Sequence, residues 1–479
     1  RARAFGADAR PSEEVRLSFT VDRTAPAPPQ LVDARSGDFY TGSRAVELTA
    51  AEGEIRYRLA LVDEPAGQWR SYRSAVRREA RPGELAHYRL EAFTVDAAGN
   101  RSGAPRVWDL YIDQEIVYVS ADAPQEADGS RRAPFSELSR AVEFALARDR
   151  RTIFVSTGTY ELSEPLRITG DLTVQGGLEA ETWRRADEGT SEIRLEGAGG
   201  GAALFEVEGS SLTLERLELF AREALVLRAL DARVFMQGLT LRAEGGPALL
   251  SASESDIEGR NLELAAGGLS GEAAVRLRGG GTSFESVTVE AGGDAGDFAV
   301  VGSDGADVRL AGTTLRTGEG RRTSAVRANG GSVRIFDSEV HAGPAADASE
   351  VVRARNAEVL IRDSVLVSSR DAGIGTVVST DGGTLTLQGS SLEVAGRRGA
   401  SGVFARGTRV SISRNAFRAG EADQFLHVMS MRDVTGTVDT NLVIGGRSRE
   451  LIVGRLVGSD TAWYNNTIRG GAGSRFTQA

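Results

Sequence analysis

The chain has 479 residues, no cysteine and a formal net charge of −10, and all 57 basic residues are arginine. The lack of cysteine excludes disulfides, thiol catalysis and cysteine metal sites, and an acidic chain without a long basic run argues against a nucleic-acid partner. The sequence contains no apolar window of about 18 residues, so we expect no transmembrane segment in it. Abundant glycine (58 residues), few aromatics (6%) and short alternating runs of valine, leucine and threonine indicate an all-β protein.

Two passages near the start are similar to each other, Arg1–Pro26 and Arg89–Gln114. Each is typical of a strand, an Asp-containing turn and a second strand. A repeat of roughly 90 residues made of short strands suits an immunoglobulin-like sandwich. We therefore expect the end of a truncated repeat over residues 1–26 and one complete domain over residues 27–114.

The complete copy resembles the bacterial immunoglobulin-like domain that is appended to chitobiases and to many surface proteins. The resemblance rests on "DFYTGSRAVELTAAEGEIRYRL" (Asp38–Leu59) and "LEAFTVDAAGNRS" (Leu90–Ser102). It implies a spacer or a weak carbohydrate or cell-surface contact. Asp96 and Asn100 are the candidates for a calcium loop, calcium being the one cofactor considered. The alternative is that both side chains only stabilise a turn around Gly99.

One short helix is predicted between the two strand-rich regions. Apolar residues in Asp128–Leu146 recur at the three-and-four spacing of an amphipathic helix, with Ser136 as the expected N-cap and Glu137 in the first turn. The surrounding segment, Val117–Thr182, resembles the amino-terminal cap of bacterial proteins of the pectin-lyase-like superfamily, through "APFSELSRA", "IFVSTGTY" and "LTVQGG". We expect residues 115–190 to form this cap and the first coils of a β-helix.

The rest of the chain repeats with a drifting period of 21 to 27 residues, as in "SVRIFDSEV", "EVLIRDSVL" and "TLTLQGSSL". Each unit offers short strands with glycine, aspartate or asparagine at the corners and too little apolar surface to fold alone, so the units must stack. Three short strands fit one coil of a right-handed parallel β-helix better than a propeller blade or a leucine-rich repeat. The predicted fold of residues 191–479 is such a β-helix, with about eleven coils over the whole helix.

Polar residues at one corner define the register. They follow one another at steps of 25 or 26 residues, each two positions before an apolar residue expected to be buried, from Leu315 to Ile468. Stacked amides and hydroxyls can hydrogen-bond from coil to coil. The predicted structural ladder consists of Thr313, Ser338, Ser364, Ser390, Asn415, Asn441 and Asn466.

The superfamily includes many polysaccharide lyases and hydrolases, which carry characteristic catalytic motifs. The Asn-Thr-Asp, Asp-Asp and Gly-His-Gly motifs of polygalacturonase-type enzymes are absent, as is lysine, one of the bases of pectate lyases. Asp337 and Asp363, one residue before the ladder on neighbouring coils, are the only weak catalytic candidates; the alternative is that they are solvated corner residues. The three histidines, His87, His341 and His427, lie too far apart along the chain to share a site.

An outward arginine column of Arg276, Arg327 and Arg353, interrupted by Val301, is the candidate binding site for acidic glycans; the alternative is protection of the strand edges. We expect a non-catalytic secreted or cell-surface protein whose β-helix rod presents a binding face. The alternative function is a polysaccharide lyase or glycoside hydrolase of the same superfamily.

The expected partners are an extracellular or envelope glycan, another protein, or a second copy of the chain. The expected location is secreted, cell-surface or periplasmic, in a bacterium. Because "RARAFG" begins within a domain and "GSRFTQA" ends within a repeat, we also expect the native polypeptide to extend at both ends.

Overall fold

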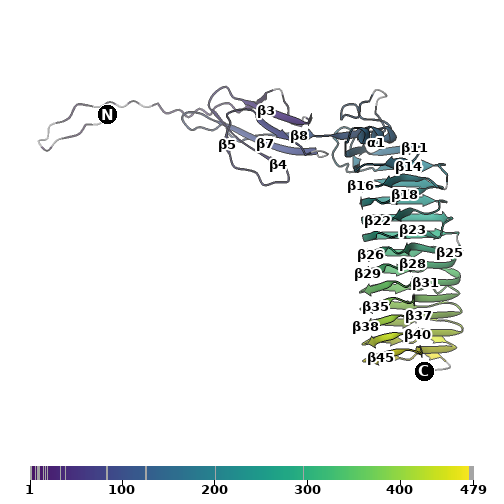
Figure 1. Cartoon of the computed structure of the whole chain (residues 1–479). Helices are drawn as coiled ribbons and strands as arrows, with labels where there is room; N and C mark the ends of the chain where they lie inside the picture. Colours follow the sequence, from purple (N-terminus) through teal and green to yellow (C-terminus); the bar gives the residue numbers. More distant parts are fainter. Residues whose placement is uncertain are drawn as a thin grey trace. The chain divides into compact units, whose positions relative to one another are not determined.

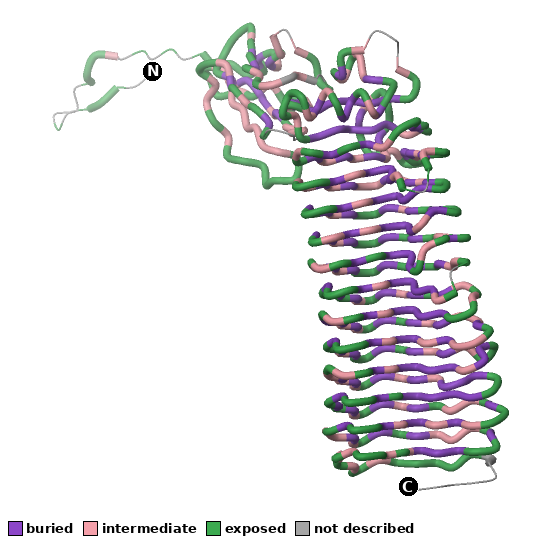
Figure 2. Tube along the Cα trace, turned by 45° about the vertical axis from the view of Figure 1, so that its right-hand side comes forward, coloured by how far each residue is buried: buried purple, intermediate pink, exposed green. Residues whose placement is uncertain are grey.

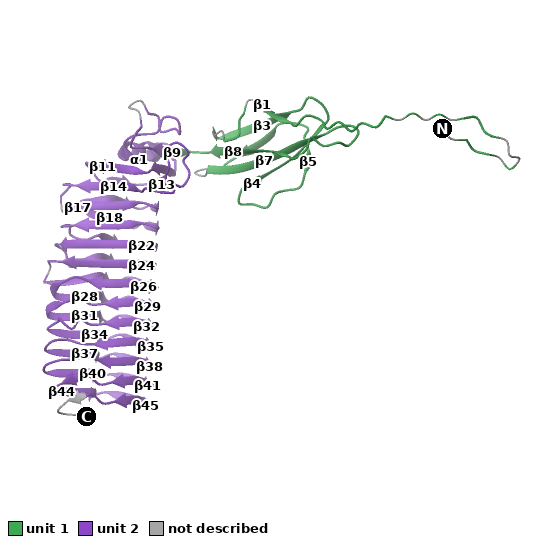
Figure 3. Ribbon diagram, turned by 180° about the vertical axis from the view of Figure 1, so that it is seen from behind, with its two compact units in different colours: residues 1–116 green, residues 117–479 purple. Residues whose placement is uncertain are grey.

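The computed structural model describes the chain except residues 1, 2, 6, 8–10, 15, 17, 19, 33, 38, 82–84, 124–126, 200, 295 and 474–479. It divides into two compact units, residues 1–116 and residues 117–479 (Figure 3). Among the described residues, no helix has the length and apolar character needed to cross a membrane.

Unit 1 contains two small sheets. One has the order β1-β3-β6, formed by Gln30–Val32, Ser43–Thr49 and Val76–Glu79. The other has the order β2-β8-β7-β4-β5, formed by Phe39–Thr41, Arg106–Asp113, Leu85–Val95, Glu54–Leu61 and Arg70–Ser71. The pairs in both sheets are antiparallel except β2 with β8, which is parallel. A core joins the two sheets through Val46 and Leu48 of β3 and Ile55, Leu90 and Leu110 of the larger sheet. The described residues of 1–26 contain no strand, only the single bridge between Phe5 and Pro11.

Unit 2 is a parallel β-helix of about 13 turns, two more than the repeat pattern predicts. Its strands stack into three rows, which we name A, B and C in the order in which a coil visits them (Figure 1). The extra turns lie in the first part, where the chain between Leu178 and Ser191 makes an irregular excursion and the repeat spacing is lost.

Row A contains β10 (Thr152–Ser156), β13 (Leu172–Leu178), β16 (Ser211–Glu215), β19 (Arg233–Gln237), the first half of β22 (Asp256–Leu269) and of β24 (Gly281–Gly293), β26 (Asp307–Ala311), β29 (Ser332–Phe336), β32 (Glu358–Arg362), β35 (Thr384–Gln388), β38 (Arg409–Ser413), β41 (Thr435–Asp439) and β45 (Asp460–Tyr464). Row B contains β11 (Gly158–Leu162), β14 (Ser191–Glu196), β17 (Glu218–Arg222), β20 (Thr240–Glu244), the second halves of β22 and β24, β27 (Thr314–Thr317), β30 (Glu339–His341), β33 (Val365–Val367), β36 (Ser391–Val394), β39 (Ala416–Ala419), β42 (Leu442–Ile444) and β46 (Thr467–Arg469).

Row C is a 12-stranded sheet of β12 (Leu166–Ile168), β15 (Ala203–Glu208), β18 (Leu225–Leu230), β21 (Leu250–Ser253), β23 (Ala273–Arg278), β25 (Asp297–Asp304), β28 (Gly320–Asn329), β31 (Ala345–Arg355), β34 (Ile374–Asp381), β37 (Gly399–Arg406), β40 (Phe425–Arg432) and β44 (Glu450–Val457). A further short pair, β43 (Arg447–Ser448) with β47 (Ala472–Gly473), lies beside the last coils.

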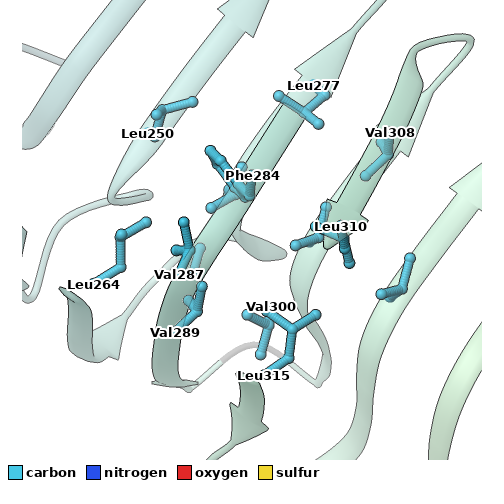
Figure 4. Close-up of a cluster of buried hydrophobic side chains, with 14 of the residues drawn as sticks. Leu250, Leu264, Leu277, Phe284, Val287, Val289, Val300, Val308, Leu310 and Leu315 are labelled. Atoms are coloured by element: carbon cyan, nitrogen blue, oxygen red, sulfur yellow. The ribbon is translucent and has the colours of Figure 1, made fainter. Parts of the chain in front are cut away.

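Alternate residues along each strand point into one continuous apolar core (Figure 2). In the close-up of Figure 4, Phe284 and Leu310 from row A lie with Leu277 from row C and Val289 and Leu315 from row B. Because each coil repeats the same inward positions, the core side chains of neighbouring coils stack on one another, and the units stabilise one another as the sequence predicts.

From β16 onward, two corners of the coils use the left-handed backbone region. Between rows A and B the residues at this corner include Asp337, Asp363 and Arg414, with φ of 48°, 50° and 57°. Between rows C and A they include Asn356 and Gly382, with φ of 49° and 76°. Glycine, asparagine and aspartate tolerate this conformation best, which explains the corner composition of the repeats.

The predicted helix is α1 (Leu138–Ala147), and it packs on β10, β11 and β12 of the first coil through Leu138, Ala141, Val142 and Ala145. Its start differs from the prediction: Glu137, not Ser136, is the N-cap residue, and it makes no capping hydrogen bond through its side chain. The reason is that Phe135 pairs alongside β9 (Ile116–Val119) through a parallel bridge to Val119, and the backbone is still extended at Glu137.

Candidate binding face on row C

The strands in the central part of row C are bent. In β25, Val300 and Val301 are consecutive and both fully buried, and pairing with β28 is present at Ala299 and Val301 but not at Val300. The outward side chains on either side of the bend converge, because a Cβ placed on Gly302 would lie 2.9 Å from the Cβ of Ala273. Row C therefore has a concave outer face.

Two columns of side chains line this concave face. The floor column contains Ala273, Ala299, Ser324, Glu350, Thr376, Ser401 and His427. The rim column contains Arg276, Gly302, Arg327, Arg353, Ser379, Phe404, Ser430 and Arg455. The three predicted arginines thus do share one column.

The residue that interrupts the arginines is Gly302, not Val301. Val301 pairs with Val275 and Val326 and is fully buried in the core. The prediction was wrong by one residue because it aligned the repeats with Val301 opposite Arg276, whereas the structure pairs Val301 with Val275 and Gly302 with Arg276.

Arg327 and Arg353 are neutralised within the protein. The Arg327 guanidinium donates to the backbone carbonyl oxygens of Glu272 (3.1 Å) and Asp297 (3.3 Å) and to the Glu272 carboxylate (3.3 Å). Arg353 Nη1 donates to Asp297 Oδ2 at 3.1 Å, and Arg353 Nε lies 3.5 Å from Glu350 Oε2. Both arginine side chains are only 23% exposed, so they mainly join neighbouring coils.

Asp297 and Glu350 are the carboxylates gathered in the concave face, and both contact Arg353. Burial raises the pKa of the Glu350 carboxyl, against the opposing effects of Arg353 and of a hydrogen bond from Ser379. Since both carboxylates are held by the same guanidinium, the group is an ion-pair network that stabilises the concave face, and it does not provide a free acid and base.

Arg276 differs from the other two arginines. It is exposed, and neither it nor Arg278, two residues further along β23, has a carboxylate partner among the described residues. Both side chains line a depression of about 570 Å³ that opens where Gly302 lacks a side chain. The other residues around it include Ser251, Ser253, Glu272, Asp304, Arg327 and Asn329.

The structure places the catalytic candidates Asp337 and Asp363 at neighbouring corners between rows A and B. Both are exposed and both have left-handed backbones. Among the described residues, no ion pair involves either carboxylate, and neither lines one of the larger depressions. Their position is explained by the backbone conformation that the corner requires.

The seven ladder residues follow one another along one corner. Each backbone N–H from Thr313 to Asn441 donates to the side chain of the next ladder residue, at distances between 2.9 and 3.2 Å. The Asn415 and Asn441 side chains also donate to the next asparagine Oδ1, each at 3.0 Å. The apolar residues two positions later are buried through Val443, but Ile468, on the last described coil, is 46% exposed.

Asp96 and Asn100, the calcium candidates, bind each other. The Asp96 carboxylate accepts hydrogen bonds from the backbone and side-chain nitrogens of Asn100, at 2.7 and 2.8 Å. The hydrogen bond from the Asn100 side chain holds the pKa of Asp96 below its ordinary value. Within the described ranges, no three acidic or histidine side chains come together as a metal site.

The three histidines lie in separate surroundings. His87 contacts Asp109 at 2.9 Å in unit 1, and His341 contacts Glu339 at 2.5 Å in row B. His427 lies in the floor column, where its Nε2 is buried without a hydrogen-bond partner. Burial lowers the pKa of His427.

Arg278 and Gly302 belong to the candidate site but were not predicted from the sequence. Arg278 could have been found, because it follows Arg276 at the two-residue spacing of one strand face. The depression itself could not have been predicted. It depends on Gly302, the rim residue of the next coil, having no side chain.

No protein-family model and no curated protein matches the chain. Solved structures similar to it include PfbA, a surface adhesin of Streptococcus pneumoniae, with 9% identity, a TM-score of 0.33 and coverage of 75% of this chain and 93% of that one. A Family 28 exopolygalacturonase of Yersinia enterocolitica has 10% identity, a TM-score of 0.32 and coverage of 94% and 100%. The catalytic domain of a GH87 alpha-1,3-glucanase has 12% identity, a TM-score of 0.30 and coverage of 94% and 89%. These proteins include both an adhesin and hydrolases, so the functional argument rests on the residues of this chain.

Proposed function

We propose that the chain is a non-catalytic, secreted or cell-surface binding protein that holds an acidic glycan on row C. The supporting observation is the depression at Gly302, where two guanidinium groups without carboxylate partners, those of Arg276 and Arg278, lie on one strand face. A guanidinium binds a carboxylate through paired, charge-assisted hydrogen bonds. The ligand class is therefore a polysaccharide bearing carboxylates, with the depression as the subsite for one uronate unit.

The concave face supports an extended ligand. The rim column runs parallel to the helix axis, so a polymer lying along it meets one rim residue about every 4.8 Å. Polar floor residues such as Ser324, Thr376 and Ser401 are already buried beneath the rim. The ligand therefore contacts the rim, and the arginines without partners provide its anchor.

For unit 1 we propose an immunoglobulin-like spacer of the kind appended to bacterial surface proteins. Two small sheets with a shared core support this assignment. The turn held by Asp96 and Asn100 then has a structural role in the spacer.

The test is a comparison of two polymers with the same backbone, polygalacturonate and its fully methyl-esterified form, by titration calorimetry. We expect the protein to bind the charged polymer and not the ester, and R276Q to weaken binding about tenfold, since one charge-assisted hydrogen-bonded pair is lost. Added salt should weaken the wild-type interaction through screening.

The matched control is R362Q, which removes an exposed arginine of row A and should leave the affinity unchanged. Equal binding of both polymers, or equal effects of R276Q and R362Q, would exclude the proposed subsite. A reducing-sugar and unsaturated-uronide assay accompanies the titration. Turnover that D337N/D363N abolishes while the fold survives would establish the enzyme alternative.

A further inference from the structure

Phe235 is an outward aromatic residue on row A, as is Phe336 further along the row. Its column neighbours on the adjoining coils are Thr213 and Glu258, and Ser283 follows on the next coil. The Phe235 ring points away from the core and lies among hydroxyl and carboxylate side chains, yet it is half-buried. Nothing in the stacking of the coils requires an aromatic residue at an outward position.

The small side chains around the ring leave a hollow. Phe235, Thr213, Gly281 and Ser283 line a depression of about 500 Å³, most of whose exposed surface is apolar. On one side the Arg260 guanidinium lies 5.8 Å from the ring centre. Arg260 is held in place by Glu258 at 2.6 Å and Glu285 at 3.6 Å. The hollow is thus built around a fixed ring.

Acidic residues outnumber arginines at the edge of this hollow, whereas arginines outnumber acidic residues around the depression on row C. Asp256, Glu258 and Asp307 line it together with a single arginine, Arg233. Two of the carboxylates also accept hydrogen bonds from the protein: Asp256 from the Gly281 backbone at 3.1 Å and Asp307 from the Ser332 hydroxyl at 2.6 Å. An anionic ligand would be repelled, whereas hydroxyl groups could donate to the free carboxylate oxygens.

We infer that this hollow is a second carbohydrate site, for an uncharged pyranose unit of a neutral glycan. The apolar C–H face of the sugar stacks on Phe235, and its hydroxyl groups bond to Glu258, Asp256 and Ser283. Such a ligand matches a site with one aromatic surface and a few convergent polar groups. The chain would then bind an acidic glycan on row C and a neutral one on row A, and could join the two polymers.

The test uses the whole chain and three neutral probes, cellohexaose, mannohexaose and N-acetylchitohexaose, titrated by NMR or calorimetry up to millimolar concentrations. We expect at least one probe to bind. F235A and F235L should each weaken that binding about tenfold, because both remove the flat ring while F235L keeps an apolar side chain. E258A should also weaken it, by removing the acceptor for a sugar hydroxyl.

The matched control is F404A, which removes an outward phenylalanine, 44% exposed, from the rim of row C. It should leave the affinity for the neutral probe unchanged, and F235A should leave the affinity for polygalacturonate unchanged. The inference is overturned if none of the three probes binds, or if F404A weakens binding as much as F235A does. Neither result bears on the acidic-glycan site, whose test uses different ligands and variants.

Discussion

The side chains of Arg276, Arg327 and Arg353 belong to one column yet have different roles. Arg327 and Arg353 are near Glu272, Asp297 and Glu350, which neutralise them. Arg276 lies on the same coil as Glu272, but the Glu272 carboxylate pairs with Arg327, so the charge of Arg276 stays available. All three are arginines of one column, so the difference comes from the acids within reach: Asp297 lies on another coil, and Glu350 lies on the same strand as Arg353.

His427 is the residue whose titration should affect stability. Since burial lowers its pKa in the folded protein, the folded state binds fewer protons than the unfolded state once the pH falls below the unfolded value of about 6.5. The contribution of neutral His427 to the free energy of unfolding is fully present above a pH of about 6.5. It is lost as the pH falls through the pKa of His427 in the folded protein.

We therefore expect acidification from about pH 8 to about pH 5 to destabilise the wild type more than H427Q, by at most about 1.4 kcal/mol per pH unit. Urea unfolding at several pH values measures this difference. H341Q provides the control, because His341 is partly exposed beside Glu339. A wild type and an H427Q variant with parallel pH profiles would show that His427 is not desolvated in the folded state.

At the level of elements, the corner between rows A and B combines two devices. One residue with a left-handed backbone turns the chain, and the next residue, in the ladder, satisfies a backbone N–H of the preceding coil. The second device supplies the hydrogen-bond partners that a buried corner would otherwise lack. It accounts for the threonine, serine and asparagine residues on the last seven coils, whereas buried Leu217, Leu239, Leu262 and Val287 occupy the same position on the four coils before them.

Replacing Asn441 by leucine should lower the free energy of unfolding by about 3 kcal/mol, because several buried groups lose their partners. Asn441 Oδ1 accepts from the Asn415 backbone and side chain, and its Nδ2 donates to the Ile412 carbonyl at 3.0 Å. Chemical denaturation measures the loss.

The neighbouring asparagine pair provides the control. Asn465 occupies the turning position with φ of 56°, where glycine is at least as favourable, so N465G should change stability by less than about 0.5 kcal/mol. If N441L cost no more than N465G, the ladder would not stabilise the corner.

For the whole molecule, the two units have separate apolar cores. The unit 1 core is small and includes Leu90, whereas the core of unit 2 runs continuously from Val117 to the last coils. In a stacked coil structure each coil is stabilised by its neighbours, so unit 2 should unfold cooperatively over many coils.

We expect two calorimetric transitions. L90A, which removes a fully buried side chain of unit 1, should cost about 2–5 kcal/mol and lower only one of them, and N441L should lower only the other. Differential scanning calorimetry of the two variants measures this. A single transition that both variants shift equally would show that the units unfold together.

The sequence alone determined the features that repeat. The step of 25 or 26 residues between polar corner residues is sufficient to find the ladder register, because a structural feature that recurs on seven successive coils leaves a periodic signal. The amphipathic spacing of Leu138, Ala141, Val142 and Ala145 identified the capping helix for a similar reason. The irregular first coils and the helix start at Glu137 carried no such signal, and the predicted number of turns was too low.

Only the tertiary structure decided the candidate sites. Whether an arginine is neutralised depends on acids such as Asp297, 30 residues before Arg327 and 56 before Arg353, which the stacking of coils brings within hydrogen-bonding distance. Whether the face is hollow depends on Gly302 and Gly281 lying beside larger side chains on neighbouring coils. Binding chemistry arises from contacts across coils at positions that do not repeat, so the sequence pattern could predict the scaffold but not which of its arginines remain free.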